Sequence, residues 1–233
     1  MKWRDIAMVI IAKEILQYEK DNIKYYINIP KIYYKEKSDK AFVKNEMIES
    51  INQVIFEDII TFMDVVENSY NVIHSNYTYI SSLTEFQIGY DSKNIISLSI
   101  EFSQLDGFYD ISYLKGYNYD LKLKKEIFLK DLFKEDLDYL KILKKYILIQ
   151  YKILTTEIQE YLENLPNYIC EDNIFLDEEN NFYFTNEYLI LPFSSCEIDE
   201  ELLNLIEFKI PFNKIYNYLS EYAIRNIVKK IIL

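Results

Sequence analysis

The chain has 233 residues, a formal net charge of −12 and an apolar fraction of 50%. This length and apolar content allow one large domain or two small ones with a sizeable core, which excludes a disordered or low-complexity chain. The charge disfavours nucleic acid and an anionic membrane surface as partners, because both require a basic protein surface.

The N-terminal third predicts two strands followed by one long helix. Residues 5–18 and 23–34 alternate or run apolar around a polar turn, which is typical of an antiparallel pair. Residues 39–75 change to helical spacing, with apolar residues at steps of three and four. The members of this stripe are Ile48, Ile51, Ile55, Ile59, Phe62, Val66, Tyr70 and Ile73. We expect the stripe to pack across a sheet.

The rest of the chain predicts three strands, a helix, a hairpin, a strand and a final helix. The ranges are 77–90, 95–105 and 108–120 for the strands, 134–165 for the helix, 180–198 for the hairpin, 208–212 for the last strand, and 213 to the C-terminus for the last helix. In the helix 134–165 the expected stripe is apolar with one polar exception, Lys144. Its apolar members are Leu137, Leu140, Ile147, Tyr151, Leu154, Ile158, Tyr161 and Leu165.

This order of elements predicts the α+β class, with an antiparallel sheet and long amphipathic helices packed on it. We expect two sub-domains: residues 1–105 with the order β-β-α-β-β, and residues 106–233 with the order β-α-β-β-β-α. The apolar run from Ile6 to Ala12 is too short for a signal peptide or a membrane span, which favours a cytoplasmic protein if the chain is taken alone.

The residues that carry most enzyme chemistry are scarce. His74 is the single histidine, at the expected end of the long helix, so a cluster of histidines around a metal ion is excluded. Cys170 and Cys196 lack the spacing of a zinc site, and both a disulfide and two free thiols are compatible with them. Only 3 glycines are present, which excludes glycine-rich phosphate loops. We therefore expect no catalytic residue, no metal and no cofactor.

Two segments, residues 114–133 and 182–211, resemble the paired domains of unknown function found in RsiV-type anti-sigma factors and beside PdaC-type peptidoglycan deacetylases. In the first segment the resemblance lies in Asn118-Tyr119-Asp120 and in Leu129-Lys130-Asp131-Leu132-Phe133. In the second it lies in Phe182-Tyr183-Phe184, in Leu189 to Phe193, and in Ile210-Pro211. The N-terminal half fits the partner domain through "INIPKI" before a helix that contains Ile51-Asn52.

The resemblance implies an extracytoplasmic, non-enzymatic binding or sensor domain that recognises a basic protein such as lysozyme. The acidic charge of the chain fits that ligand, although acidity also simply keeps proteins soluble. The 23 tyrosines and 14 phenylalanines, with abundant carboxylates, leave a second hypothesis: a domain that binds cell-wall polysaccharide, or a hydrolase that uses a carboxylate pair.

Two loops depart most from the family pattern, and we predict that they converge to form one binding site; the alternative is two unrelated solvated turns. They are residues 105–113 and 194–201, both next to expected core strands. The site would combine an aromatic anchor with carboxylates that suit a cationic protein surface. Its predicted members are Phe108, Tyr109, Glu197, Asp199, Glu200 and Glu201.

Overall fold

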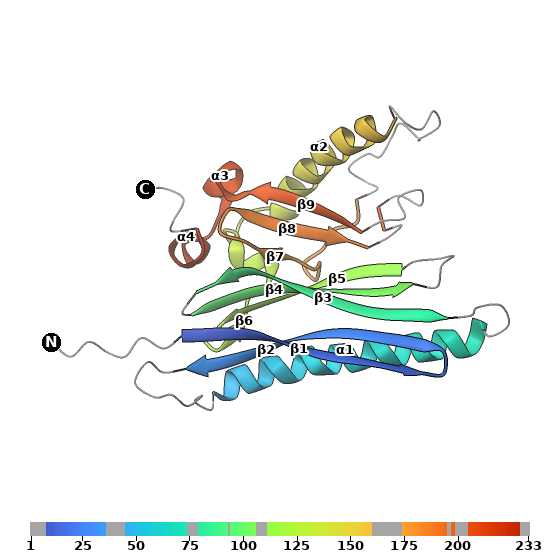
Figure 1. The fold of residues 1–233 in the computed structure, drawn as a ribbon. Coiled ribbons are helices and arrows are strands. Elements are labelled where there is room, and N and C mark those ends of the chain that lie inside the picture. Colours follow the sequence, from blue (N-terminus) through green and yellow to red (C-terminus); the bar gives the residue numbers. More distant parts are fainter. Residues whose placement is uncertain are drawn as a thin grey trace.

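The computed structural model describes residues 8–35, 45–73, 79–92, 94–105, 111–159, 174–194, 197–198 and 205–228. Strands and helices follow one another in nearly the predicted order, and they form two sheets with helices on their outer faces (Figure 1). The α+β class is confirmed.

The larger sheet has six strands, which lie side by side in the order of the chain. They are β1 (Met8–Lys20), β2 (Ile23–Lys35), β3 (Ile80–Asp91), β4 (Ile95–Leu105), β5 (Ile111–Asp120) and β6 (Lys125–Glu126). Four of the pairings are antiparallel, as expected, but β2 and β3 pair in parallel. The parallel pair arises because the long helix between them returns the chain to the end of the sheet where β2 begins.

The long helix α1 (Glu46–Ile73) buries the predicted apolar stripe. Ile51, Ile55 and Val66 are at most 1% exposed, and they pack against β2 and β4 in one hydrophobic core. The helix begins later than predicted, where the backbone N–H of Ile48 donates to the side chain of Asn45 at 3.2 Å. The side chain of Ile73 is outside the described residues.

The smaller sheet is antiparallel and has three strands: β7 (Tyr183–Phe184), β8 (Tyr188–Phe193) and β9 (Ile206–Pro211). The helical elements around it are η1 (Leu129–Leu132), α2 (Tyr139–Gln159), α3 (Phe212–Ile215), η3 (Tyr216–Tyr218) and α4 (Glu221–Asn226). The single C-terminal helix that the sequence predicted is interrupted at Leu219, which forms a β-bridge with Phe133, and Ser220 then caps α4.

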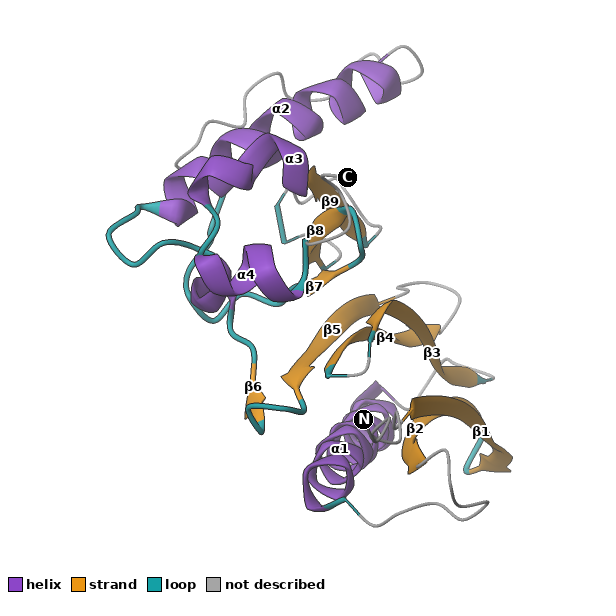
Figure 2. Ribbon diagram, turned by 90° about the vertical axis from the view of Figure 1, so that its left-hand side faces the viewer, coloured by secondary structure: helices purple, strands orange, loops and turns teal. Residues whose placement is uncertain are grey.

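The elements stack in layers, with α1 on one face of the six-stranded sheet and the three-stranded sheet on the other (Figure 2). The helices α2 and α3 lie on the side of the smaller sheet away from the six-stranded sheet (Figure 1). Helix α4 lies beside the junction, where the hydroxyl of Tyr90 in β3 donates to the carbonyl oxygen of Asn226 at 3.2 Å. Strands β5 and β6 lie in the larger sheet, so this sheet continues past residue 105, the boundary predicted between the two sub-domains, as far as Glu126. No helix within the described ranges combines the length and the apolar content that crossing a bilayer requires.

Candidate functional site

The chain around β7 lies directly on the six-stranded sheet, at two glycines. A Cβ atom at Gly116 would lie 1.8 Å from the carbonyl oxygen of Phe182, and one at Gly89 would lie 2.4 Å from that of Phe184. Any larger residue would push the two backbones apart. The hairpin of β7 and β8 is therefore part of the scaffold that joins the two sheets.

A buried polar network fixes this junction. The Ser97 hydroxyl donates to Oδ1 of Asn118 at 2.7 Å, and Nδ2 of Asn118 donates to the carbonyl oxygen of Phe182 at 2.8 Å. The backbone N–H of Phe184 donates to Oγ of Ser97 at 2.8 Å. Because each group has a partner, the network ties β7 to β4 and β5 without leaving these buried polar atoms unpaired.

Asp120, the acidic residue of the Asn-x-Asp segment, has an equally structural role. Its Oδ1 accepts the backbone N–H groups of Lys122 and Leu123, and its Oδ2 accepts the hydroxyl of Tyr222 at 2.8 Å. Burial, and next the hydrogen bond to Asp120, raise the pKa of Tyr222 well above its ordinary value. This carboxylate holds the turn after β5 and connects it to α4.

Asp131, in the second motif of the resemblance, also joins elements. It accepts the backbone N–H of Phe128 at 3.0 Å, pairs with Lys125 at 3.1 Å, and its own carbonyl accepts the hydroxyl of Ser220 at 2.7 Å. Ser220 in turn caps α4 by accepting the N–H of Ala223. The residues that carry the resemblance therefore build the fold, and a binding surface has to be sought elsewhere.

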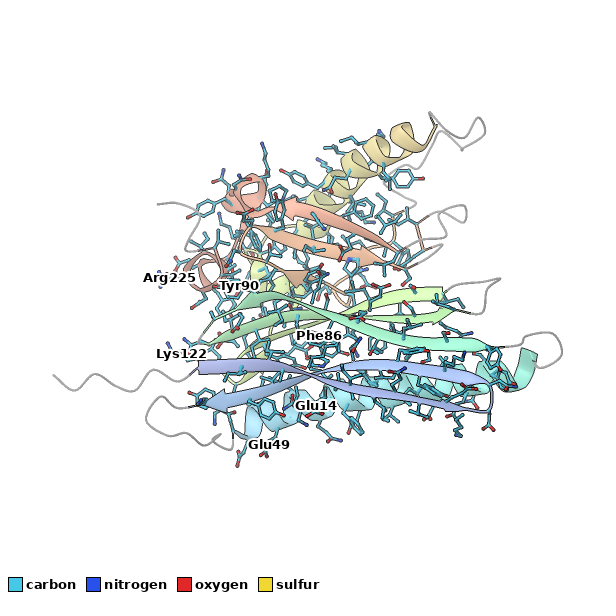
Figure 3. The ribbon with its side chains drawn as sticks, viewed as in Figure 1. Glu14, Glu49, Phe86, Tyr90, Lys122 and Arg225 are labelled. Atoms are coloured by element: carbon cyan, nitrogen blue, oxygen red, sulfur yellow. The ribbon has the colours of Figure 1, made fainter. Side chains whose placement is uncertain are left out.

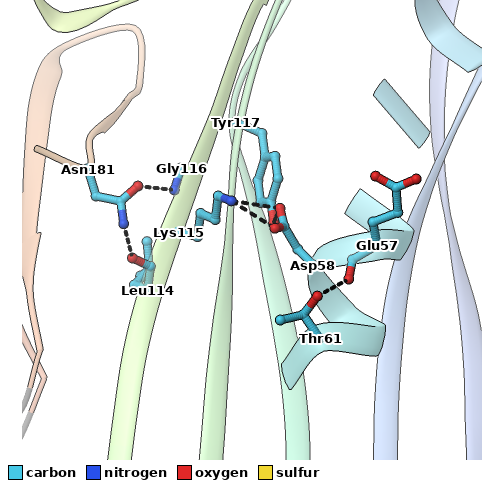
Figure 4. A network of polar contacts seen from close by, with 8 residues as sticks. All are labelled: Glu57, Asp58, Thr61, Leu114, Lys115, Gly116, Tyr117 and Asn181. Carbon is cyan, nitrogen blue, oxygen red and sulfur yellow. Dashed lines mark hydrogen bonds and ion pairs between the residues drawn. The ribbon is translucent and has the colours of Figure 1, made fainter. Parts of the chain in front are cut away.

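The side chain of Asn181 forms hydrogen bonds with the backbone at the edge of β5, beside the junction of the two sheets (Figure 4). Its Nδ2 donates to the carbonyl oxygen of Leu114 at 3.0 Å, and its Oδ1 accepts the N–H of Gly116 at 3.3 Å. The amide thus replaces a neighbouring strand over this short stretch of the edge.

On the face of β5 that is turned toward α1, Asp58 of this helix accepts two hydrogen bonds (Figure 4). Lys115 donates to Asp58 at 2.8 Å, and so does the Tyr117 hydroxyl. Burial, and next the charge of Asp58, raise the pKa of Tyr117 far above its ordinary value, so this phenol stays protonated. The cluster anchors the helix to the sheet.

An acidic groove of about 330 Å³ opens where β5 begins and β8 ends. It is lined by Leu114, Phe175, Asp177, Glu179, Asn180, Asn181, Pro192, Ser194 and Glu197. Phe175 is 79% exposed, which is unusual for a large apolar side chain. The groove therefore combines an accessible aromatic ring with three carboxylates.

Local hydrogen bonds hold the walls of the acidic groove in place. In the turn before β7, Asp177 accepts the N–H of Glu179 at 2.8 Å, and the N–H of Asp177 donates to the side chain of Asn180. Across the groove, Glu197 accepts the N–H of Ser194 at 2.6 Å. The carboxylates of Asp177 and Glu197 are thus held in place by hydrogen bonds to nearby backbone N–H groups.

A second pocket of about 460 Å³, the junction pocket, lies between the β5 edge, the chain around β6 and the turn at 178–182. Phe128 is 50% exposed there. Removal of water by the surrounding protein raises the pKa of Glu126, whose side chain still reaches solvent, and the charge of Lys115 partly opposes this rise. A carboxyl group and an aromatic ring thus line the same pocket.

Of the predicted site residues, the structure places Glu197 in the acidic groove. Phe108, Tyr109, Asp199, Glu200 and Glu201 lie outside the described residues. The described flanks of the two predicted loops are close, since Leu114 near the start of β5 and Glu197 beyond the end of β8 line the same groove (Figure 1).

Sequence reasoning missed Phe175, Asp177 and Glu179. The signal was present in "FLDEENN", an aromatic residue that precedes a run of acidic and amide side chains. No group of three or more His, Cys, Asp or Glu side chains in the described part of the chain is placed to hold a metal ion. His74, Cys170 and Cys196 are outside that part.

No family model matches the sequence, and a search of curated proteins finds no match either. Two solved structures of DUF3298 family proteins share the fold. One, from Bacteroides fragilis NCTC 9343, has a TM-score of 0.52 and 14% identity, and the match covers 97% of this chain and 98% of that one. The other, from Pseudomonas aeruginosa PAO1, has a TM-score of 0.55 and 9% identity, with coverage of 93% and 95%. DUF3298 is related to the domains that the sequence resembles, and at these identities the likeness shows the fold.

Proposed function

We propose that this chain is a non-enzymatic binding or sensor domain that recognises a basic protein, such as a lysozyme, through the acidic groove. The observation that carries the proposal is the exposed ring of Phe175 beside the carboxylates of Asp177, Glu179 and Glu197. An accessible aromatic ring gives a partner an apolar anchor, and the surrounding carboxylates select a cationic surface.

The charge of the whole chain supports the same partner. A net charge of −12 attracts a basic protein over long range, raises its rate of encounter and repels acidic proteins. The groove lies at the junction of the two sheets, where Asn181 and the buried network around Asn118 fix the backbone. A partner would thus meet a preformed surface, which lowers the entropic cost of binding.

Titration with a basic lysozyme at moderate salt tests this function. We expect saturable binding that weakens as salt is added, because the attraction between exposed charges is screened. An acidic protein of similar size is the control and should not bind. Absence of binding by the folded protein would rule out this ligand.

The junction pocket supports a second candidate function, the binding or carboxylate-dependent hydrolysis of cell-wall polysaccharide. Phe128 offers a ring on which a sugar can stack, and the raised pKa of Glu126 is the property that a general acid needs. Turnover of peptidoglycan or chitin oligomers that is lost in Glu126→Gln would favour this function over the first. Binding of these oligomers without turnover would favour a glycan-binding domain.

A further inference from the structure

The outer edge of the six-stranded sheet is formed by β1, which among the described residues pairs only with β2. The strand is 13 residues long, and its register with β2 runs without a shift from Met8 to Lys20. Every side chain from Lys13 to Lys20 is exposed, and Ile15 is 69% exposed. This edge is long, regular and open to solvent.

The hairpin turn determines which backbone groups point outward from β1. Asp21 and Asn22 both have positive φ, 51° and 63°, as in a two-residue type I′ turn, so Lys20 and Ile23 form the closing hydrogen-bonded pair. Even-numbered residues of β1 therefore direct their N–H and C=O groups toward β2. The odd-numbered residues, such as Ile15 and Gln17, direct theirs outward.

The hydrogen bonds of β2 agree with this alternation. On its edge away from β1, the N–H and C=O of Asn28 bond to the hydroxyl of Thr84, and those of Ile32 bond to the side chain of Asn52. Pro30, between them, has no N–H to satisfy. Where β3 diverges from β2, side chains and a proline thus protect the strand edge.

The outer edge of β1 has none of these protections along Lys13–Lys20, which contains no proline and no bulge. Natural proteins usually cover or interrupt such an edge, because its unpaired backbone groups bind any extended chain that fits. The charges on β1 alternate in sign instead of repelling uniformly, since Lys13 and Glu14 are adjacent and so are Glu19 and Lys20.

We propose that β1 pairs with β1 of a second copy of this chain, antiparallel, across a two-fold axis at Leu16. The axis is perpendicular to the sheet, so each residue faces a residue of the same parity in the other copy. In this register Leu16 faces Leu16, Lys13 faces Glu19, Glu14 faces Tyr18 and Ile15 faces Gln17. Lys13 and Glu19 thus meet opposite charges, and Glu14 meets a hydrogen-bonding group. Lys20 faces Ala12 and keeps its ion pair with Glu67 at 3.0 Å. The two sheets join into one continuous sheet.

Neighbouring registers are less favourable. An axis at Lys13 or at Glu14 would place two like charges directly opposite each other. An axis at Ile15 would place Glu19 opposite Ile11 and Lys13 opposite Gln17, so that neither charge faces an opposite charge. An axis at Gln17 would place Glu14 opposite Lys20, but Lys20 already pairs with Glu67 at 3.0 Å, and Ile15 would face Glu19. The axis at Leu16 pairs Lys13 with Glu19 and leaves the Lys20–Glu67 pair in place.

Reversal of the Lys13–Glu19 pair tests this register. Lys13→Glu should raise the dissociation constant of the dimer roughly tenfold, because the substitution creates two repulsive pairs across the axis. Glu19→Lys should do the same, and the double variant should return close to the unmodified protein. Lys122→Glu, which has the same change of charge in the turn after β5, should have no effect (Figure 3).

The measurement is sedimentation velocity over a wide range of protein concentration. Circular dichroism checks that each variant is folded, which we expect because these side chains are exposed and the contact of Lys13 with Glu85, at 3.7 Å, is weak. A protein that is monomeric at all concentrations would overturn the proposal. So would a dimer that ignores the Lys13 and Glu19 substitutions, or one that the double variant fails to restore.

Discussion

Nδ2 of Asn118 donates a hydrogen bond of 2.8 Å to the carbonyl oxygen of Phe182, across the contact between the two sheets. Both residues belong to segments in which the sequence resembles the paired domains of RsiV-type and PdaC-type proteins. The contact joins two chain segments that are far apart in the sequence, so the fold itself requires these residues. This structural requirement accounts for the resemblance in both segments.

We predict that Asn118→Ala lowers the free energy of unfolding by about 2–4 kcal/mol. The substitution removes the donor to the carbonyl of Phe182 and the acceptor of the Ser97 hydroxyl, and each unsatisfied buried group costs about 1–3 kcal/mol. Urea denaturation gives the value. Asn213→Ala, on the exposed face of α3, is the matched control and should change it by less than about 0.5 kcal/mol. Equal effects of the two substitutions would contradict the role of the network.

Gly116→Ala should destabilise the protein by about 1–3 kcal/mol or more, since the added methyl group meets the backbone of Phe182 and has no room to move away. Gly89→Ala should have a smaller effect in the same direction, because its closest contact is longer. The ranking can be measured from the denaturation midpoints. A neutral Gly116→Ala variant would show that β7 does not lie against β5 in solution.

Ile55→Asp should prevent folding. Ile55 is 0% exposed in the core between α1 and the sheet, and an unpaired charge there costs several kcal/mol, which is of the order of the total stability. The next residue provides the control, because Phe56 is 48% exposed and Phe56→Asp should fold. Circular dichroism distinguishes the two results. If Phe56→Asp also failed to fold, the prediction that α1 buries the face of Ile55 and exposes the face of Phe56 would be contradicted.

The protein should lose stability in alkali between about pH 10 and pH 12. Burial, and next the charge of Asp58, raise the pKa of Tyr113 to about 12, and burial and the charge of Glu126 raise the pKa of Tyr119 to about 12. The ordinary value is 10.0. Because the folded pKa is the higher one, this contribution is complete below pH 10 and is lost as the pH rises toward 12.

Denaturation at stepped pH measures this decline. Tyr113→Phe combined with Tyr119→Phe should make it shallower, because these phenols no longer titrate. Tyr218→Phe, at an exposed position, should leave it unchanged. If the double variant declined as steeply as the unmodified protein, other groups would have to account for the loss.

Periodicity predicted the elements that pack by one regular stripe. The spacing from Ile48 to Val66 gave α1 and its buried face correctly. In α2 the buried residues are Tyr139, Leu143, Ile147 and Tyr151, so the predicted stripe was only partly right. The amphipathic pattern of α2 is blurred, because Leu140 and Tyr146 are partly buried against the same core.

Features that depend on contacts between distant parts of the chain could not be predicted from the sequence. The interruption of the C-terminal helix follows from the bridge between Leu219 and Phe133, and the parallel pairing of β2 with β3 follows from the return of the chain through α1. In the acidic groove, Glu197 was predicted from the acidic loop. Phe175 was not, because its exposure depends on how the chain before β7 lies on the sheet.

The most direct test of the proposed function is the rate at which a basic lysozyme associates with the Glu179→Lys and Asp64→Lys variants. Both carry the same change of net charge, but Glu179 lines the acidic groove and Asp64 is on the exposed face of α1. We predict that Glu179→Lys slows association more than Asp64→Lys and accelerates dissociation, with folding intact, because a rim charge of the groove steers the partner and then contacts it. Equal slowing in both variants, with unchanged dissociation, would show that only net charge matters and would contradict recognition at the acidic groove.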